Sequence, residues 1–171
     1  DAGKCTPSDV KTKRFALLLD KLDIKKDPLT ISQSYESHLG AEVHWYPGVK
    51  ETLTELHKKY KIAIITNGLT SVQRKKYTLS GLDQISDHIT ISEELGISKP
   101  KKEIFTHTLN ALSSKAENTL MLGDSLTSDY QGAMNSNIDF CWIHNLESPL
   151  PSNYPKNAFS LNTVAALPKL L

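Results

Sequence analysis

The stretch MLGDSLTSDYQGA, from Met121 to Ala133, begins as a short apolar run and ends that run on an acid, Asp124, with a second acid, Asp129, five positions later. Such a run is typical of a buried strand, and an acid at its end needs a partner. Mg²⁺ prefers hard oxygen ligands and usually takes one or two carboxylates together with water and phosphate oxygens. The stretch therefore predicts a Mg²⁺ site. A helix cap is the alternative role, more for Asp129 than for Asp124.

Helix and strand patterns alternate on both sides of this stretch. The run Lys61–Ile65 is rich in β-branched residues and apolar on both faces, as in a buried parallel strand. Further strands are expected near His88–Ile91, Thr119–Leu122, Phe140–Ile143 and Ala158–Leu161, and helices around Val49–Tyr60, Ser71–Leu79, Lys101–Leu112, after Asp129 and at the C-terminus. Strands separated by helices predict βαβ crossovers, and hence an α/β fold with a doubly wound parallel sheet.

The first part of the chain has a different character. Residues 1–45 show only helical patterns, with one helix over roughly Pro7 to Lys21 and a second that begins at Asp27-Pro28 and runs out at Gly40. The strand patterns all lie in residues 46–171. We therefore expect a helical portion, 1–45, followed by an α/β domain, 46–171.

Composition limits the class of protein. The chain has 171 residues, of which 39% are hydrophobic, and this is enough for one sizeable core. Twenty Lys and Arg against nineteen Asp and Glu leave a net charge of +1, so nothing favours nucleic acid or an anionic membrane as partner. Cys5 and Cys141 are isolated, as expected of reduced structural thiols. With only short apolar runs and no apolar leader, we expect a soluble cytoplasmic protein that binds a small molecule.

Polar residues follow the first predicted strand and precede a later helix. In open parallel sheets ligands bind at the carboxyl ends of the strands. There Thr66, Asn67 and Gly68 offer a hydroxyl, an amide and close backbone approach, which could hold an anion near a helix start, although Thr-Asn-Gly is also an ordinary turn. Lys99, just before a proline, can project a point charge toward phosphate. Its alternative role is that of a solvated lysine in a basic run.

Three motifs occur in order: I-I-T-N-G at Ile64–Gly68, G-I-S-K-P-x-x-x-I-F at Gly96–Phe105 and L-G-D-S-x-x-S-D at Leu122–Asp129. They resemble three of the four motifs of the haloacid dehalogenase-like (HAD) phosphohydrolases, which have a Rossmann-like core. The similarity extends from Tyr46 to the C-terminus and looks closest to the pyrimidine and noncanonical 5′-nucleotidase branch. Residues 1–45 resemble the later helices of the small helical cap of such enzymes.

The resemblance implies a role for each candidate residue. Thr66 and the backbone amide of Asn67 would hold the transferring phosphoryl group, and Lys99 would neutralise charge between the nucleophile and the phosphate. Asp124 would ligate Mg²⁺, while Asp129 would support the metal site or orient Lys99. The implied activity is Mg²⁺-dependent hydrolysis of a phosphate monoester, most readily a nucleoside monophosphate, through an aspartyl-phosphate.

The first motif of that family has no counterpart in this sequence. It consists of an apolar strand followed by D-x-D-x-[TV] and supplies the nucleophilic Asp, whereas the pair Asp20 and Asp23 lies at a helix end. The family's first strand lies in the middle of the sheet, between the strands that end at Thr66 and Asp124, and its loss would leave unpaired backbone groups. We therefore expect a truncated enzyme, inactive as these residues alone.

Two rival functions remain. One is 2-haloacid dehalogenation, which also uses an Asp nucleophile but no metal, and which the acid pair disfavours. The other is an inactive fragment that serves as a binding or regulatory module, which the presence of Thr66, Lys99 and Asp124 disfavours. Several side chains near the end of the helical portion could face substrate, but core packing or anchoring is the expected role for each; they are Tyr35, His38, His44 and Trp45.

Overall fold

The computed structural model describes residues 7–144 and 159–171. The α-helices are α1 (Pro7–Lys21), α2 (Pro28–Leu39), α3 (Val49–His57), α4 (Thr70–Ser80), α5 (Ser92–Leu95), α6 (Lys102–Ala111) and α7 (Gln131–Asn135). The strands are β1 (Ala63–Thr66), β2 (His88–Ile91), β3 (Leu120–Gly123), β4 (Asp139–Ile143) and β5 (Phe159–Leu161). Shorter helical segments are η1 (Leu82–Gln84), η2 (Ala116–Asn118), the π-helical η3 (Leu126–Tyr130) and η4 (Val164–Lys169).

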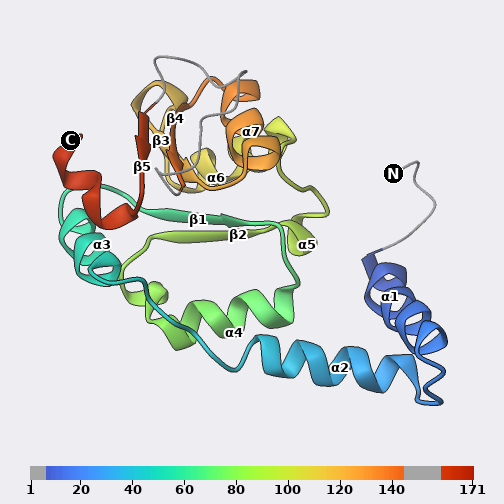
Figure 1. Cartoon of the computed structure of the whole chain (residues 1–171). Helices are drawn as coiled ribbons and strands as arrows, with labels where there is room; N and C mark the ends of the chain where they lie inside the picture. Colours follow the sequence, from blue (N-terminus) through green and yellow to red (C-terminus); the bar gives the residue numbers. More distant parts are fainter. Residues whose placement is uncertain (1–6, 145–158) are drawn as a thin grey trace.

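The strands form two parallel sheets (Figure 1). One sheet pairs β1 with β2, from Ala63 opposite His88 to Thr66 opposite Ile91. The other has the order β3-β4-β5 and is also parallel throughout. The predicted parallel α/β architecture is thus confirmed. Within the described residues no ladder joins β1 to β3, so each of these strands has one edge without a strand partner.

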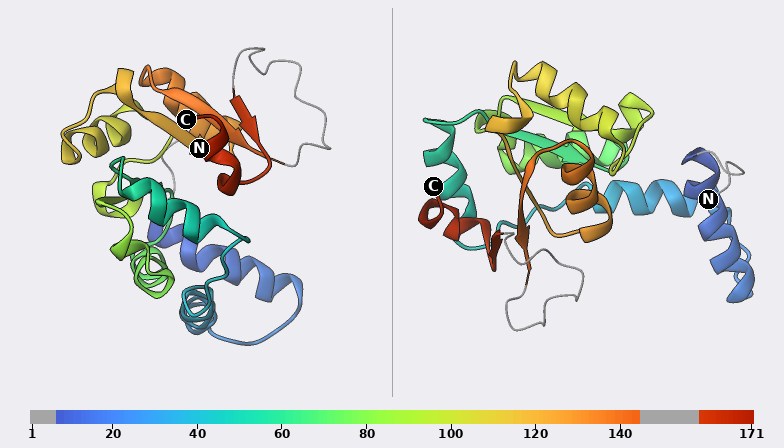
Figure 2. Two further views of the ribbon diagram at one scale, coloured as in Figure 1. Left: turned by 90° about the vertical axis from the view of Figure 1, so that its left-hand side faces the viewer. Right: turned by 90° about the horizontal axis from the view of Figure 1, so that it is seen from above.

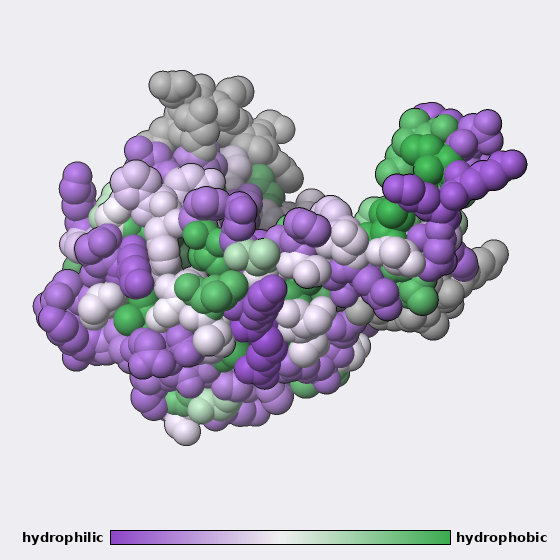
Figure 3. All heavy atoms as spheres, turned by 90° about the horizontal axis from the view of Figure 1, so that it is seen from below, coloured by the Kyte–Doolittle hydropathy of each residue, from purple (hydrophilic) through white to green (hydrophobic). Residues whose placement is uncertain are grey.

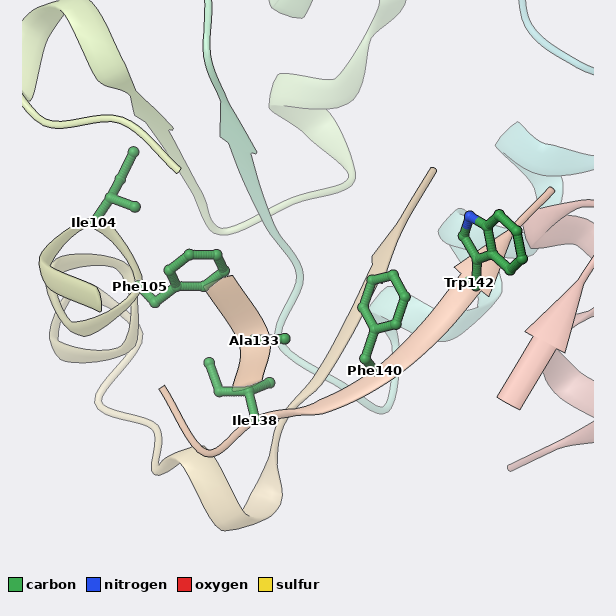
Figure 4. Close-up of a cluster of buried hydrophobic side chains, with 6 residues drawn as sticks. All are labelled: Ile104, Phe105, Ala133, Ile138, Phe140 and Trp142. Carbon is green, nitrogen blue, oxygen red and sulfur yellow. The ribbon is translucent and has the colours of Figure 1, made fainter. Parts of the chain in front are cut away.

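A hydrophobic core of the described residues lies where α6, α7 and the segment through β4 meet. Its side chains come from α6, α7 and the segment through β4, and they are Ile104, Phe105, Ala133, Ile138, Phe140 and Trp142 (Figure 4). Gly132 is part of this close packing, because an added Cβ there would overlap the Phe105 ring and lie 3.3 Å from the backbone of Pro100. The core thereby fixes the loop before α6 against α7.

Burial of the strands differs from the expectation for β1. The sequence predicts a fully buried strand, but all four residues of β1 are only half-buried. In β4, by contrast, Phe140, Cys141 and Trp142 are buried in succession. The physical reason is position, because β4 has a strand on each side whereas β1 has one on one side only.

The helical portion stands beside the α/β body (Figures 1 and 2). The expected cap of α2 is present, since the Asp27 carboxylate accepts from the backbone N–H groups of Leu29 and Thr30. Phe15 and Leu19 of α1 are buried. Two other leucines of α1 and one just after it remain exposed, and hydrophobic side chains are visible on this lobe (Figure 3); the exposed residues are Leu17, Leu18 and Leu22.

Most element boundaries lie within two residues of those expected from the sequence, as for β1, which was expected at Lys61–Ile65 and runs from Ala63 to Thr66. The larger differences lie in helical segments. The helix from Val49 ends at His57 instead of reaching Tyr60, and the short helix α5 was not expected. The C-terminal helix is a 3₁₀ segment that contains Pro168, a residue that cannot donate an α-helical hydrogen bond. Cys5 and the expected loop 147–155 lie outside the described residues. None of the described helices combines the length and the apolar character needed to cross a membrane.

Candidate active site

Lys99 brings the end of β1 and the segment after β3 together. Its ammonium Nζ donates to the carbonyl oxygen of Ile65 at 2.8 Å and lies 2.7 Å from Oδ1 of Asp129. The Lys99 side chain is only 11% exposed and that of Asp129 only 5%. The alternative of a solvated surface lysine is therefore wrong. The structure thus holds the Lys99 ammonium between the carbonyl of Ile65 and the carboxylate of Asp129.

Asp129 serves two partners with its two oxygens. It is buried within η3, where Oδ2 accepts from the backbone N–H of Ser125, the N-cap residue of that segment, at 3.1 Å. Oδ1 faces Lys99 outside hydrogen-bonding angles, so that contact is chiefly ionic. Of the roles considered for Asp129, capping and orienting Lys99 both have geometric support. Because both oxygens of Asp129 already have a partner, its carboxylate is less available to bind a metal ion.

Gly123 is what allows Asp129 to sit so close to β3. A Cβ at this position would overlap the Asp129 carboxylate and lie 2.5 Å from its Cβ and Cγ, far inside van der Waals contact. The glycine of the Leu122–Asp129 motif therefore has a packing reason. It places the buried acid of η3 directly against the strand that ends before Asp124.

Asp124 is the acid that is available to a ligand. It is exposed, and within the described part of the chain its carboxylate has no hydrogen bond or ion pair. Its backbone carbonyl accepts from Nε1 of Trp142 at 3.0 Å, which ties the loop to β4. No group of three or more acidic, His or Cys side chains that could hold a metal occurs among the described residues. Because Mg²⁺ can bind through one protein carboxylate with water and phosphate, Asp124 alone still fits such a site.

Thr66 and Asn67 lie at the end of β1 but differ in what their side chains do. Thr66 is half-buried, and no hydrogen bond of its hydroxyl occurs within the described region. The Asn67 side chain instead binds the backbone of Lys99, with Oδ1 accepting from its N–H at 2.8 Å and Nδ2 donating to its carbonyl at 2.9 Å. The amide that the sequence offers to an anion is thus engaged by Lys99.

The helix start after Gly68 already has an acidic partner. The N-cap residue of α4, Leu69, has no capping side chain, and the N–H of Thr70 is bound by the Glu93 carboxylate of α5 at 2.7 Å. At this helix start, the N–H of Thr70 therefore binds the Glu93 carboxylate of the chain itself, where the sequence predicted a bound anion. Sequence reasoning missed Glu93 because the contact joins residues that are far apart in the chain.

The aromatic and histidine residues considered for substrate contact have local structural roles. Tyr35 lies against Phe15, with ring centroids 5.5 Å apart. The indole of Trp45 donates to the carbonyl of Ser80 at 3.2 Å. The His38 ring contacts the carbonyl of Ser34 at 2.7 Å. His44 is 86% exposed. The contacts of Tyr35, His38 and Trp45 agree with the expected packing or anchoring. The exposed His44, by contrast, neither packs nor anchors in the described structure.

Comparison with known proteins identifies relatives over most of the chain. Residues 11–143 match the family model described as haloacid dehalogenase-like hydrolase. The chain is 32% identical to the HAD-hydrolase YfnB of Bacillus subtilis over 84% of its length, and 30% identical to the pyrimidine 5′-nucleotidase YjjG of Escherichia coli over 86%. It is 31% identical to the pyrimidine 5′-nucleotidase PynA of Streptococcus pneumoniae over 85%. The chain spans 62%, 66% and 63% of these three proteins, less than two thirds of each.

The fold matches a solved structure of one of these relatives. The crystal structure of YfnB from Bacillus subtilis, described as bound to magnesium, superimposes with a TM-score of 0.85 at 29% identity. The match covers 99% of this chain and 74% of the YfnB chain. The α/β arrangement of the described residues is thus similar to that of YfnB.

Proposed function

Because the chain belongs to the haloacid dehalogenase-like hydrolases, we propose that it is the larger part of a Mg²⁺-dependent phosphomonoesterase that acts on nucleoside monophosphates. The observation that carries this proposal is the ammonium of Lys99, whose side chain is only 11% exposed and which is held between Ile65 and Asp129. The exposed Asp124 belongs to the same segment after β3 as Asp129. A held cation and a free carboxylate suit a ligand that carries both negative charge and a bound metal ion.

Each residue of the site has a distinct task in this proposal. Lys99 offsets negative charge on the phosphate as a point charge, and its low exposure strengthens that interaction. Thr66 donates its hydroxyl, and Asn67 its backbone N–H, to phosphate oxygens. Asp124 ligates Mg²⁺, which when bound neutralises further phosphate charge. Phosphoryl transfer depends mainly on such positioning and charge stabilisation.

The nucleophile in this proposal is an aspartate outside the 171 residues. Its carboxylate attacks phosphorus, the bond from phosphorus to the ester oxygen breaks, and the departing alkoxide takes a proton from a general acid, which in the second step accepts a proton from the attacking water. Water then attacks the aspartyl-phosphate and releases inorganic phosphate and the free carboxylate. Among the strands that the structure describes, β1 and β3 each have an edge without a strand partner, which is compatible with a strand that carries this residue.

The substrate class rests on two of the relatives. YjjG and PynA are pyrimidine 5′-nucleotidases and match over 86% and 85% of this chain. We extend that activity to this protein and assign residues 1–45 to part of a cap that covers the leaving group. The exposed leucines of α1 are consistent with further helices packing there.

The experiment is a phosphatase assay over nucleoside monophosphates and sugar phosphates. It compares the 171-residue chain with a longer protein that includes the coding sequence upstream of Asp1. We expect hydrolysis by the longer protein only, with nucleoside monophosphates preferred and with EDTA abolishing turnover. Turnover that survives EDTA would contradict the metal-dependent mechanism, and an inactive longer protein would favour the binding-module alternative.

Variants of the longer protein test the assigned residues. Asp124→Ala should abolish Mg²⁺-dependent turnover, and Lys99→Ala should lower kcat by about 10²–10³-fold, as for other groups that stabilise transition-state charge. Lys115→Ala is the matched control, because that lysine is 77% exposed and pairs only loosely with Glu117. Near-normal activity of either site variant would refute its assignment.

A further inference from the structure

Asn67 makes an unusual use of its side chain at the end of β1. Its Oδ1 accepts from the N–H of Lys99 at 2.8 Å, while its Nδ2 donates to the carbonyl of the same residue at 2.9 Å. One amide thus satisfies both backbone polar groups of a residue that lies 32 positions away. A primary amide is suited to this pairing, because it presents a donor and an acceptor side by side.

Lys99 has little else to hold its backbone. It lies in the connection between α5 and α6, outside any helix or strand. The only backbone hydrogen bond within that connection in the described structure runs from the N–H of Lys101 to the carbonyl of Ser98. The Asn67 side chain therefore takes the place of the regular backbone pairing that Lys99 lacks.

The other end of Lys99 is held from the same strand. The Nζ atom donates to the carbonyl of Ile65, two residues before Asn67, and pairs with Asp129. Residues at the end of β1 therefore form hydrogen bonds both with the backbone of Lys99 and with its ammonium group. A lysine side chain has many rotamers, so fixing its backbone limits where the ammonium can go. Release of the backbone end would let the ammonium leave the site.

We propose that Asn67 is a positioning residue whose side chain fixes the backbone of Lys99, and through it the ammonium group, instead of contacting the phosphate. The proposal deepens the proposed function, since it rests on Lys99 as the residue that meets the phosphoryl group. It separates two groups of one residue, because the proposed function assigns the backbone N–H of Asn67 to phosphate while its side-chain amide binds Lys99.

The test uses the 171-residue chain and NMR of its labelled lysine ammonium groups. The Lys99 signal is assigned by its absence in Lys99→Arg. In Asn67→Ala we expect this signal to lose its distinct position and exchange protection and to join those of the exposed lysines. Asn67→Asp keeps an acceptor for the Lys99 N–H but loses the donor, so an intermediate change is expected. Asn118→Ala, at an exposed residue before the start of β3, should leave the signal unchanged.

Titration with inorganic phosphate separates this proposal from the proposed function. We expect phosphate to shift the Lys99 signal of the unaltered chain and to bind about tenfold more weakly to Asn67→Ala, as the loss of two modest hydrogen bonds implies. Weaker binding with an unchanged Lys99 signal would mean direct phosphate contact and would overturn the positioning role. No phosphate response in the unaltered chain would count against the proposed function, while the ligand-free Lys99 signal still decides the role of Asn67.

The folded state of each variant is checked by its thermal unfolding midpoint. Asn67 is exposed, so its truncation leaves no internal cavity. If Asn67→Ala does not fold, Asn67→Asp is judged by the same Lys99 signal. A folded Asn67→Asp with that signal unchanged would overturn the proposal, and an altered signal would support it.

Discussion

At the scale of single residues, several side chains at the site each make a hydrogen bond with a backbone group of a distant or neighbouring segment. Lys99 binds the carbonyl of Ile65, Asp129 binds the N–H of Ser125 and Trp142 binds the carbonyl of Asp124. Backbone groups are fixed by the fold and carry no sequence signal of their own. The side chains that meet them can therefore be placed only once the fold is known.

His88, at the start of β2, is a single residue whose environment makes stability depend on pH. Burial lowers the pKa of its ring, and the nearby positive charges of His107 and Arg74 lower it further. The described structure gives its Nε2 no hydrogen-bond partner. The folded state therefore favours the neutral ring, and the resulting stability is complete above the unfolded pKa and is lost as pH falls through the folded pKa.

We predict that His88→Asn reduces this pH dependence. The measurement is the free energy of unfolding by urea at about pH 7.5 and about pH 5.5, a window that spans the ordinary His pKa and the range below it. The unaltered chain should lose more stability between these values than the variant does. His44→Asn is the control, because His44 is 86% exposed. Equal losses in the unaltered chain and in His88→Asn would contradict the prediction.

At the scale of elements, side chains of α5 bind α4, the helix that follows β1. Glu94 of α5 binds Arg74 of α4 through both oxygens, at 2.8 and 2.7 Å, and this pairing lowers the pKa of Glu94 and raises that of Arg74. Its neighbour Glu93 accepts from the N–H of Thr70 at the start of α4. A four-residue helix thus supplies the cap that Leu69 cannot provide.

We predict that Glu93→Ala destabilises the chain by about 0.5–2 kcal/mol, the usual cost of losing an N-cap side chain. Glu93→Gln keeps an oxygen acceptor and should lose less. Urea unfolding measures both changes. Glu42→Ala, at a residue that is 80% exposed, should have little effect. A cost for Glu93→Ala no larger than that of the control would show that α4 does not depend on this cap.

At the scale of the whole molecule, the Lys99–Asp129 ion pair links the segments that follow the two sheets near the site. No ladder joins β1 to β3 within the described residues, and the Lys99–Asp129 contact spans from the β1 side to the β3 side. Both charges are largely removed from water, so leaving either one alone is costly. We therefore expect the pair to matter for stability as well as for chemistry.

We predict that Lys99→Met and Asp129→Asn each cost about 3–5 kcal/mol, because each leaves one buried charge without its partner. The double variant should cost clearly less than the sum, since it removes both charges. A double-mutant cycle of unfolding free energies measures the difference. The exposed pair Lys115–Glu117, at 3.6 Å, is the matched control, for which a coupling of at most about 1 kcal/mol is expected. Additive costs at Lys99 and Asp129 would contradict the prediction.

The sequence by itself determined the element order, the parallel α/β class and the set of candidate residues. Helical and strand periodicities are local properties, and α1, α2 and β2 have the bounds expected from them. The motif letters likewise identified Lys99, Asp124 and Asp129 before any contact was known. These features could be predicted because each depends on residues that are near one another in the chain.

Only the tertiary structure decided how those residues are used. It placed the Asn67 amide on the backbone of Lys99, gave Asp129 to Lys99 and Ser125, and left the carboxylate of Asp124 exposed. It also showed β1 as half-buried, because burial depends on which strands and helices lie beside it. Contacts between distant segments depend on how strands, helices and loops pack together, and local sequence patterns do not specify that packing.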